Sequence, residues 1–190
     1  MTESPTSSFT GSVFIAASLD GFIATPDGDL AWLTGRAEAI GDTGYDDFIA
    51  SVDAIAMGRN TYEKTLTFGG WPYEGLQAFV LSSTLDPASD PKVGVHPTVD
   101  DLIAGMNASG VRSVYVDGGM LIGAFLERGL ISEFTLTTAP VILGSGIPLF
   151  HRLPHEIPLQ LAELKDLGGG FTQAEYTVSD SRPVPAGRSA

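Results

Sequence analysis

The fold of this chain is decided by a short stretch that passes from apolar residues through a glycine into a helical pattern: Asp53–Ala54–Ile55–Ala56–Met57–Gly58–Arg59–Asn60–Thr61–Tyr62–Glu63. Residues 53–57 are mostly apolar, which is typical of a strand buried on both faces of a sheet. Gly58 permits a tight turn, and the residues after it predict a helix over 59–66. The stretch therefore predicts one strand–turn–helix unit of an α/β protein.

The same unit recurs on both sides of this stretch. Three further buried strands are predicted from apolar runs, at 13–17, 78–81 and 114–116. Further helical patterns cover residues 43–52, 98–107 and 119–128. This alternation of strands and helices predicts an α/β fold whose sheet is mainly parallel.

The pattern changes after Gly129. Extended runs follow one another at 134–141, 159–167 and 171–178, and three glycines (168–170) separate the last two. We expect these two runs to form an antiparallel C-terminal hairpin, so the sheet should be mixed. The polar ends, rich in Ser, Thr and Pro, predict flexible tails around a single domain. The expected boundaries are 1–10 and 179–190 for the tails and 11–178 for the domain.

Length and composition limit the functions that are open to the chain. Its 190 residues suit one domain. Ten Lys and Arg against 23 Asp and Glu give a formal net charge of −13, which argues against nucleic-acid or membrane-surface binding. The chain has no cysteine, and its three histidines are too scattered to suggest a metal site. Without a membrane span or a signal-peptide pattern, we expect a cytoplasmic protein that binds a small molecule.

Four features follow predicted strands, at the edge of the sheet where α/β proteins bind ligands. They are the loop 18–24, the turn 58–61, the hydroxyl-rich strand end 82–84 and the glycine pair 118–119. Glycine turns at helix starts expose backbone N–H groups that can bind phosphate with few cations. Each feature alone is also explained by an ordinary turn, a strand end or close helix–strand packing. Together they favour a dinucleotide site.

Taken in order, these features resemble the dihydrofolate reductase superfamily, and in particular its branch that includes the reductase domain of bacterial riboflavin biosynthesis. Ala16–Ala24 resembles the first strand and loop of that branch. Gly58–Thr61 is similar to the superfamily's Gly-Arg-x-Thr helix start, and Val116–Gly119 to its late Gly-Gly turn. Ala139–Phe150 resembles the run before the final hairpin. The resemblance covers nearly the whole chain, residues 11–178.

The resemblance implies a dihydrofolate reductase-like fold: a mixed, mostly parallel sheet of about eight strands flanked by helices. It also implies NADPH as hydride donor, a pterin- or pyrimidine-like heterocycle as substrate, and a homodimer. The apolar segment 134–149 would lie at the dimer interface or inside the sheet. The residues implied for the cofactor are Ala16, Ala17 and Ile23 beside the nicotinamide, Gly58, Arg59 and Thr61 at the phosphate region, Ser82 and Ser83 at the adenosine ribose or its 2′-phosphate, and Gly118, Gly119, Met120 and Leu121 at the pyrophosphate.

The chain departs from the family pattern at the cofactor site. Dihydrofolate reductases usually carry a basic residue just after the late glycines, where this chain has Met120 and Leu121. No arginine follows Ser83 directly either. Arg59 is then the only cation in the motifs that could meet a 2′-phosphate, so a preference for NADPH over NADH should depend on it.

Two carboxylates are candidates for the group that protonates the substrate. In dihydrofolate reductases, a helix carboxylate binds the pterin through two hydrogen bonds and helps to protonate it. The corresponding helix here contains Asp46, at the edge of its apolar face, and Asp47, which points away. Asp46 is therefore the candidate acid and substrate ligand, unless it is a solvated residue favoured by the helix dipole. Asp20 is the alternative acid, and Trp32 belongs to the substrate pocket or to the core.

The leading hypothesis is an NADPH-dependent reductase that transfers hydride to a C=N or C=O of a bound heterocycle. Dihydrofolate and the ribosylamino-pyrimidine of riboflavin synthesis compete as substrates. The second needs cations for its phosphate, and the chain has only three lysines, at 64, 92 and 165. A nucleotide-binding module without turnover is the alternative from a different class of protein. A purely structural protein fits poorly with glycine turns at strand ends.

Overall fold

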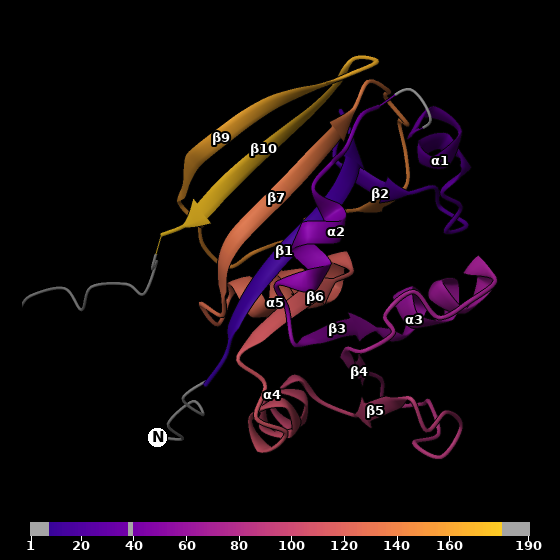
Figure 1. Ribbon diagram of the computed structural model, residues 1–190, viewed down its shortest axis with the longest axis vertical. Helices are drawn as coiled ribbons and strands as arrows, with labels where there is room; N and C mark the ends of the chain where they lie inside the picture. Colours follow the sequence, from indigo (N-terminus) through magenta and orange to yellow (C-terminus); the bar gives the residue numbers. More distant parts are fainter. Residues whose placement is uncertain (1–7, 38–39, 180–190) are drawn as a thin grey trace, which may run out of the picture.

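A computed structural model describes residues 8–37 and 40–179, and a central sheet runs through this part of the chain (Figure 1). The strands are β1 (Thr10–Ser18), β2 (Phe22–Ala24), β3 (Ala54–Gly58), β4 (Gln77–Leu81), β5 (Val93–His96), β6 (Ser113–Asp117), β7 (Ile131–Ala139), β8 (Ile147–Pro148), β9 (Leu159–Gly168) and β10 (Phe171–Val178). The helices are α1 (Ala31–Ala37), α2 (Tyr45–Ala50), α3 (Arg59–Thr65), the 3-10 helix η1 (Leu66–Phe68), α4 (Val99–Ala108) and α5 (Gly119–Leu126).

Eight strands form the main sheet, in the order β5-β4-β3-β6-β1-β7-β10-β9. The first six are parallel to their neighbours, whereas β10 is antiparallel to both β7 and β9. A separate short pair is formed by β2 and β8. The predicted fold is therefore confirmed: an α/β fold with a mixed, mostly parallel sheet of eight strands and an antiparallel C-terminal pair.

The central strands are buried because apolar side chains cover both faces of the sheet. Residues 54–57 of β3 and 114–116 of β6 are all buried. One apolar cluster joins β1, β6 and β7 to α4 and α5, and a second joins β3 and β4 to α2 and α3. Full burial of a side chain such as Phe125 or Ile55 contributes about 2 kcal/mol. Packing on two faces thus explains why these strands read as continuous apolar runs.

The C-terminal hairpin is closed by two glycines. Gly169 and Gly170 form the loop, with φ angles of 59° and 83°, while Gly168 pairs with Phe171. Two-residue hairpin loops of type I′ require positive φ at both positions, which glycine adopts without strain. The three consecutive glycines are therefore explained by the turn that joins β9 to β10.

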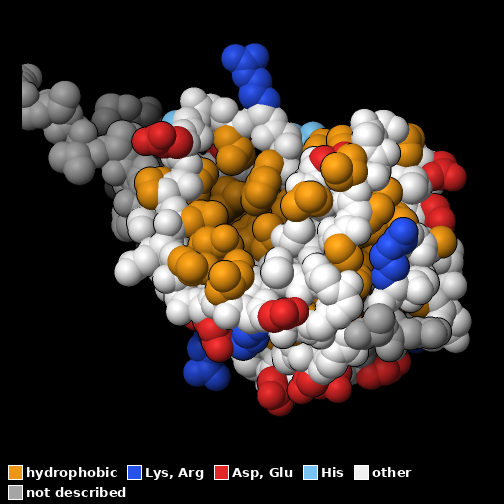
Figure 2. Space-filling view, turned by 90° about the horizontal axis from the view of Figure 1, so that it is seen from above, with side chains coloured by type: hydrophobic (Ala, Val, Ile, Leu, Met, Phe, Trp, Pro, Cys, Tyr) orange, Lys and Arg blue, Asp and Glu red, His pale blue; other side chains and the backbone are white. Residues whose placement is uncertain are grey.

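Strand β9 forms one edge of the sheet and exposes apolar side chains. Leu159, Leu161 and Leu164 are 42%, 51% and 64% exposed. Figure 2 shows hydrophobic side chains around a hollow on the left half of the view, the side on which β9 and β10 lie in Figure 1. An exposed apolar edge strand favours association with another chain. The homodimer that the resemblance implies nevertheless stays a prediction.

Short elements differ most from the sequence-based expectation. The region after β1, expected as a long loop, contains β2 and begins α1. With three and two residues, β2 and β8 are too short to produce a periodic pattern. The four residues of β5 include Gly94 and His96, so their sequence does not resemble an apolar strand.

Residues on the N-terminal side of the expected domain boundary at residue 11 pack against the domain. Phe9 is buried, with its ring centroid 6.3 Å from that of Phe125, and β1 starts at Thr10. The Ser8 hydroxyl donates a hydrogen bond to Asn107 Oδ1 at 2.7 Å. The rest of the predicted tails, apart from Ser179, lies outside the described residues.

Within residues 8–37 and 40–179, no helix is long and apolar enough to cross a membrane, since the longest, α4, has 10 residues. In the same two ranges, no group of three His, Asp or Glu side chains lies close enough to hold a metal ion.

Helix α5 begins at a glycine because backbone carbonyls lie against it. A Cβ atom on Gly119 would lie 2.7 Å from the carbonyl oxygens of both Pro148 and Leu149, which is closer than real Cβ contacts. Farther along the same helix, a Cβ on Gly123 would meet Leu153 Cδ2 at an ordinary 3.8 Å. The packing therefore requires glycine at 119 and permits alanine at 123.

We expect Gly119→Ala to lower the free energy of unfolding by about 2 kcal/mol, because the backbone must move to admit the methyl group. The matched variant Gly123→Ala should be neutral, or stabilising by up to about 1 kcal/mol, because alanine favours the helix. Urea denaturation followed by circular dichroism measures both. Equal losses of stability in the two variants would contradict the close contact at Gly119.

Candidate active site

The candidate site lies at the edge of the sheet where β3, β6 and β1 end. These strands are parallel neighbours, so their carboxyl ends share that edge. The connections also change direction here: β3 is followed outward by β4 and β5, whereas β6 returns to lie between β3 and β1. Ligands of open α/β sheets bind outside the carboxyl ends of strands at such a switch point.

Three residues assigned to the cofactor phosphates come together at this edge. Gly118 has a φ angle of 93°, and a Cβ atom on it would lie 2.6 Å from Thr61 Oγ1 and 4.0 Å from the Gly58 nitrogen. The starts of α3 and α5 are therefore neighbours. Within the described residues, no side chain bonds the N–H groups of the first turn of either helix, although the Gly118 nitrogen before α5 donates to Asp117 Oδ1 at 2.8 Å. Such N–H groups can bind an anion.

Arg59 lies close to the hydroxyl group of Thr84. Its Nη1 donates a hydrogen bond to Thr84 Oγ1 at 3.3 Å, and its Nε lies 3.8 Å from a Glu63 carboxylate oxygen. Ser82 is buried, and its Oγ accepts bonds from the backbone nitrogens of Thr84 and Leu85 at 3.2 and 2.9 Å. Ser82 thus ends the strand. Thr84, which bonds Arg59, is a hydroxyl residue that the structure adds to those predicted for the adenosine ribose or its 2′-phosphate.

The remaining cofactor candidates lie in different environments. Ala16 lines a cavity on one face of β1, while Ala17 and Ile23 pack in the main core cluster. Met120, at the start of α5, is 70% exposed. Leu121 is buried in the core, so it could offer a ligand only backbone groups. Ser83 is exposed beside Ser82.

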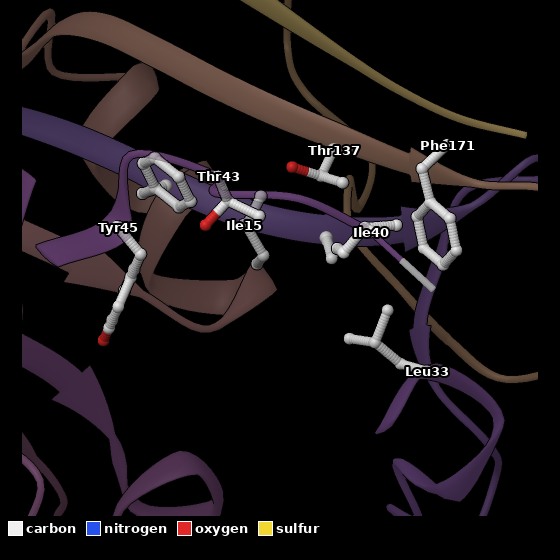
Figure 3. Close-up of a pocket in the computed structure, with 9 residues that line it drawn as sticks. Ile15, Leu33, Ile40, Thr43, Tyr45, Thr137 and Phe171 are labelled. Atoms are coloured by element: carbon white, nitrogen blue, oxygen red, sulfur yellow. The ribbon is translucent and has the colours of Figure 1, made fainter. Parts of the chain in front are cut away.

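A cavity of about 240 Å³ lies between β1, α1 and the segment that leads into α2 (Figure 3). Most of its walls are apolar, and Thr43, Thr137 and the ring of Tyr45 add hydroxyl-bearing side chains. The lining residues are Phe14, Ile15, Ala16, Leu33, Ile40, Thr43, Tyr45, Thr137 and Phe171. The apolar walls of this cavity suit a small molecule with an apolar body.

Two predicted substrate residues lie beside the cavity rather than in its wall. Trp32 is buried in a cluster with Phe171, Leu33 and Ile40, which all line the cavity. Asp46 is exposed on α2, next to Tyr45, and is not among the lining residues. The geometry therefore does not bring Asp46 to a ligand in this cavity, and its predicted role has no support from the contacts described.

Asp20 holds two loops together. Its carboxylate accepts hydrogen bonds from Ser18 Oγ at 2.7 Å and from the backbone nitrogens of Leu143 and Gly144 at 3.0 and 2.7 Å. These bonds, first the one from Ser18, lower the pKa of the Asp20 carboxyl. A carboxylate stabilised in its charged form is a poor proton donor at neutral pH. The contacts thus favour a structural role for Asp20.

Asp117, the last residue of β6, is a better candidate for the proton donor. Burial raises the pKa of its carboxyl to about 6, although the hydrogen bond from the Gly118 nitrogen at 2.8 Å opposes this rise. Removal from water disfavours the charged form of an acid. A carboxyl with a pKa near neutrality at a ligand-binding edge can both hold and release a proton.

Three tyrosines lie close enough to Asp117 for its charge to act on their hydroxyls, and one of them, Tyr45, lines the cavity. Burial, and next the negative charge of Asp117, raise the pKa of the hydroxyls of Tyr45, Tyr73 and Tyr115. The Tyr115 hydroxyl donates to the Phe14 carbonyl oxygen at 2.9 Å. Tyr45 and Phe14 both line the cavity, so the Asp117 cluster lies at one end of it.

Asp117 lies within the Val116–Gly119 motif, but the sequence alone did not indicate a role for it. Its position was informative: it is the only acidic residue that directly precedes one of the two glycine turns at helix starts. The pKa of its carboxyl is raised by burial, and only the fold produces that burial. The signal in the sequence was therefore its place at a strand end, and the chemistry came from tertiary packing.

The raised pKa predicts a pH-dependent gain in stability for Asp117→Asn. The folded pKa of about 6 exceeds the ordinary 3.8, so wild-type stability falls as pH rises from about 4 to about 6 and is constant above that. Asparagine does not titrate, so the free energy of unfolding of the variant should exceed that of wild type by up to about 3 kcal/mol above pH 6. Urea denaturation at several pH values measures this. Asp47→Asn, on an exposed helix position, is the matched control, and an equal pH effect there would contradict the prediction.

Comparisons with known proteins show which family the chain resembles. The sequence profile of the RibD C-terminal domain matches residues 10–172. The YwjB protein of Bacillus subtilis (strain 168) is 38% identical over 160 residues, which cover 82% of this chain and 91% of YwjB. The riboflavin biosynthesis protein RibD of Corynebacterium ammoniagenes is 30% identical over 145 residues, which cover 70% of this chain and 43% of RibD.

Solved structures agree with the sequence matches. A protein of Shewanella sp. PV-4 assigned to riboflavin biosynthesis superposes with a TM-score of 0.80 at 35% identity, covering 90% of this chain and 99% of that chain. RibD of Acinetobacter baumannii superposes with a TM-score of 0.65 over 90% of this chain and 58% of that chain, and at 17% identity this likeness shows the fold alone. The resemblance found in the sequence is confirmed, and the chain belongs to the RibD C-terminal domain family.

Proposed function

We propose that this protein is an NADPH-dependent reductase of a small pterin- or pyrimidine-like heterocycle. The observation that carries the proposal is the position of Asp117 at the end of β6: its carboxyl accepts a hydrogen bond from the Gly118 nitrogen, has a pKa raised by burial to about 6, and lies close enough for its charge to act on Tyr45, which lines the cavity. Membership of the RibD C-terminal domain family supports a reductase. A reductase needs a place for a dinucleotide, a place for a ring and a source of protons, and each has candidate residues here.

The donors at the edge of the sheet fit the phosphates of a dinucleotide. Gly58, Thr61 and Gly118 lie together at two helix starts, and no side chain within the described residues bonds the N–H groups of the first turn of either helix. A Cβ atom on Gly58 would meet nothing within 4 Å, so space is open beside that backbone. The guanidinium of Arg59 and the Thr84 hydroxyl supply a cation and a donor for a 2′-phosphate. Backbone amides at helix starts explain how so acidic a chain could bind an anion.

The cavity suits the ring that would be reduced. Ala16 lines it from β1, in the segment assigned to the nicotinamide side of the site. The ring of Tyr45 and the apolar walls would hold a flat heterocycle out of water, which strengthens the electrostatic effect of nearby groups. When bound, NADPH supplies the hydride.

Asp117 would supply the proton that accompanies the hydride. With a pKa of about 6, its carboxyl is protonated in a fraction of molecules at neutral pH. The proton would go to the nitrogen or oxygen of the C=N or C=O group, and the carboxylate left behind would be reprotonated from solvent. General acid catalysis of this kind is worth about 100-fold to 10,000-fold in rate.

A substrate with a phosphoribosyl group is less well supported. A solved structure from Thermotoga maritima is that of a protein named as a 5-amino-6-(5-phosphoribosylamino)uracil reductase, and its chain is 13% identical to this one. A phosphate ester needs cationic or amide partners. Among the described residues that line the cavity, none is Lys or Arg. We therefore favour an unphosphorylated ring as the substrate.

Steady-state oxidation of NADPH with a panel of dihydropterins, pyrimidines, flavins and quinones tests the reductase. We expect turnover with at least one pterin or pyrimidine, and a loss of kcat of about 100-fold or more in Asp117→Asn. Wild-type kcat should fall as pH rises past about 6, because the acid form of Asp117 is lost. Asp47→Asn is the matched control, and Asp46→Asn tests the carboxylate that the sequence favoured.

Calorimetric titration with NADPH separates the alternatives. Binding of NADPH without oxidation by any compound in the panel would favour a nucleotide-binding module. The absence of NADPH binding would rule out the proposed reductase. A loss of kcat in Asp46→Asn but not in Asp117→Asn would show that the proton donor is Asp46 of α2 and not Asp117.

Arg59→Ala should remove a preference for NADPH over NADH. The lost charge should raise the KM for NADPH about tenfold and leave that for NADH unchanged, since only NADPH carries the 2′-phosphate. Arg112→Ala is the control, because Arg112 is exposed next to the opposite end of β6. Kinetics with both cofactors measure the ratio. An unchanged ratio in Arg59→Ala would show that other groups recognise the 2′-phosphate.

A further inference from the structure

Met120 is the most exposed of the large apolar side chains in the part of the chain that the structure describes, at 70%. The other bulky residues of α5 are buried: Leu121, Ile122, Phe125 and Leu126. Single exposed apolar residues are common on protein surfaces, so exposure alone assigns no role to this one. Its place does, because it lies at the end of α5 that carries the candidate cofactor site.

The methionines of the chain differ in their access to solvent. Met57 of β3 and Met106 of α4 are both 0% exposed, inside the two main apolar clusters. Met1 lies outside the described residues. A thioether is oxidised to a sulfoxide where an oxidant can reach its sulfur. In the folded protein, a peroxide in solvent therefore reaches Met120 and is kept away from Met57 and Met106.

Met120 also lies beside the N–H groups that would bind a phosphate. It is the second residue of α5, and long side chains in helices lean toward the N-terminal end of the helix. We therefore expect its sulfur to lie over the first turn of α5, whose N–H groups bond no side chain within residues 8–37 and 40–179. Gly119 has little room to shift in response to a change there, because the carbonyl oxygens of Pro148 and Leu149 lie against it.

We propose that Met120 is an oxidation site through which a peroxide weakens the binding of the dinucleotide at the start of α5. The Met120 sulfur attacks one oxygen of hydrogen peroxide, an S–O bond forms as the O–O bond breaks, and water leaves. The thioether is thereby oxidised to a sulfoxide, and the peroxide is reduced. The inference rests on the proposed function for the identity of the dinucleotide, but the oxidation requires neither cofactor nor turnover.

The new oxygen changes what the side chain can bond. A thioether is a weak hydrogen-bond acceptor, whereas the oxygen of a sulfoxide is polar and accepts readily. Over the first turn of α5, this oxygen competes with a phosphate for the free N–H groups. Because Met120 is exposed, the added polarity does not disturb the core, so the effect falls on binding and not on folding.

Mass spectrometry of peptides after treatment with hydrogen peroxide locates the oxidation. We expect one added oxygen on Met120 well before any on Met57 or Met106, which should react only in urea-unfolded protein. Isothermal titration calorimetry with NADPH should show an affinity about tenfold lower after oxidation, the effect of one lost hydrogen bond, with an unchanged free energy of unfolding. Methionine sulfoxide reductases A and B should restore the affinity.

Three variants assign the effect to the Met120 sulfur. Met120→Leu is similar in size but has no sulfur, so peroxide should leave its affinity for NADPH at the value of the untreated variant. Met120→Gln carries an oxygen acceptor without oxidation and should bind NADPH about as weakly as oxidised wild type. Met106→Leu is the matched control, because it removes a buried methionine and should lose affinity on oxidation as wild type does.

Two results would overturn the proposal: oxidation of Met57 or Met106 as fast as that of Met120, or an affinity for NADPH that peroxide leaves unchanged in wild type or lowers equally in Met120→Leu. Turnover of NADPH with such a peroxide-insensitive affinity would count against this proposal alone. Peroxide-sensitive binding of NADPH without turnover of any compound in the panel would count against the reductase alone.

Discussion

The close contact between three chain segments at the Gly118–Gly119 turn is the constraint on which the candidate site depends. Thr61 of α3 leaves no room for a side chain at 118, and the carbonyl groups of Pro148 and Leu149 leave none at 119. This contact fixes where α5 begins relative to β3 and to the segment before the hairpin. It also fixes the position of Asp117, one residue earlier, where burial raises the pKa of its carboxyl. The same two glycines thus allow the three segments to pack closely and fix the position of the candidate acid, Asp117.

The carboxylates of this chain show how surroundings decide the role of one side-chain type. Asp20 accepts hydrogen bonds from a hydroxyl and two backbone amides, which stabilise its charged form. Asp117 accepts one backbone bond and loses much of its contact with water, which favours its neutral form. The first is thereby suited to hold loops, and the second to exchange a proton.

The sheet was predictable because its central strands are buried on both faces and appear as apolar runs, and because the glycine triplet marks the final hairpin. A resemblance to a known family assigned Gly58, Thr61 and Gly118 to one cofactor site, and the fold brings these three residues together. Asp117 could not be assigned in this way, because the burial that raises the pKa of its carboxyl comes from tertiary packing. Helical periodicity correctly separated the two faces of α2, but it could not show that Asp46 lies outside the cavity wall.

The reversed direction of β10 has a consequence for the order in which the molecule is built. Its first residue, Phe171, lines a cavity to which β1 also contributes Phe14, Ile15 and Ala16. During synthesis, β1 must wait for β10 to emerge before that cavity is complete. Until then, the apolar residues of β1 lack part of their cover, so a nascent chain is more exposed to aggregation than the finished protein. The candidate site is thus completed only after β10 has been made.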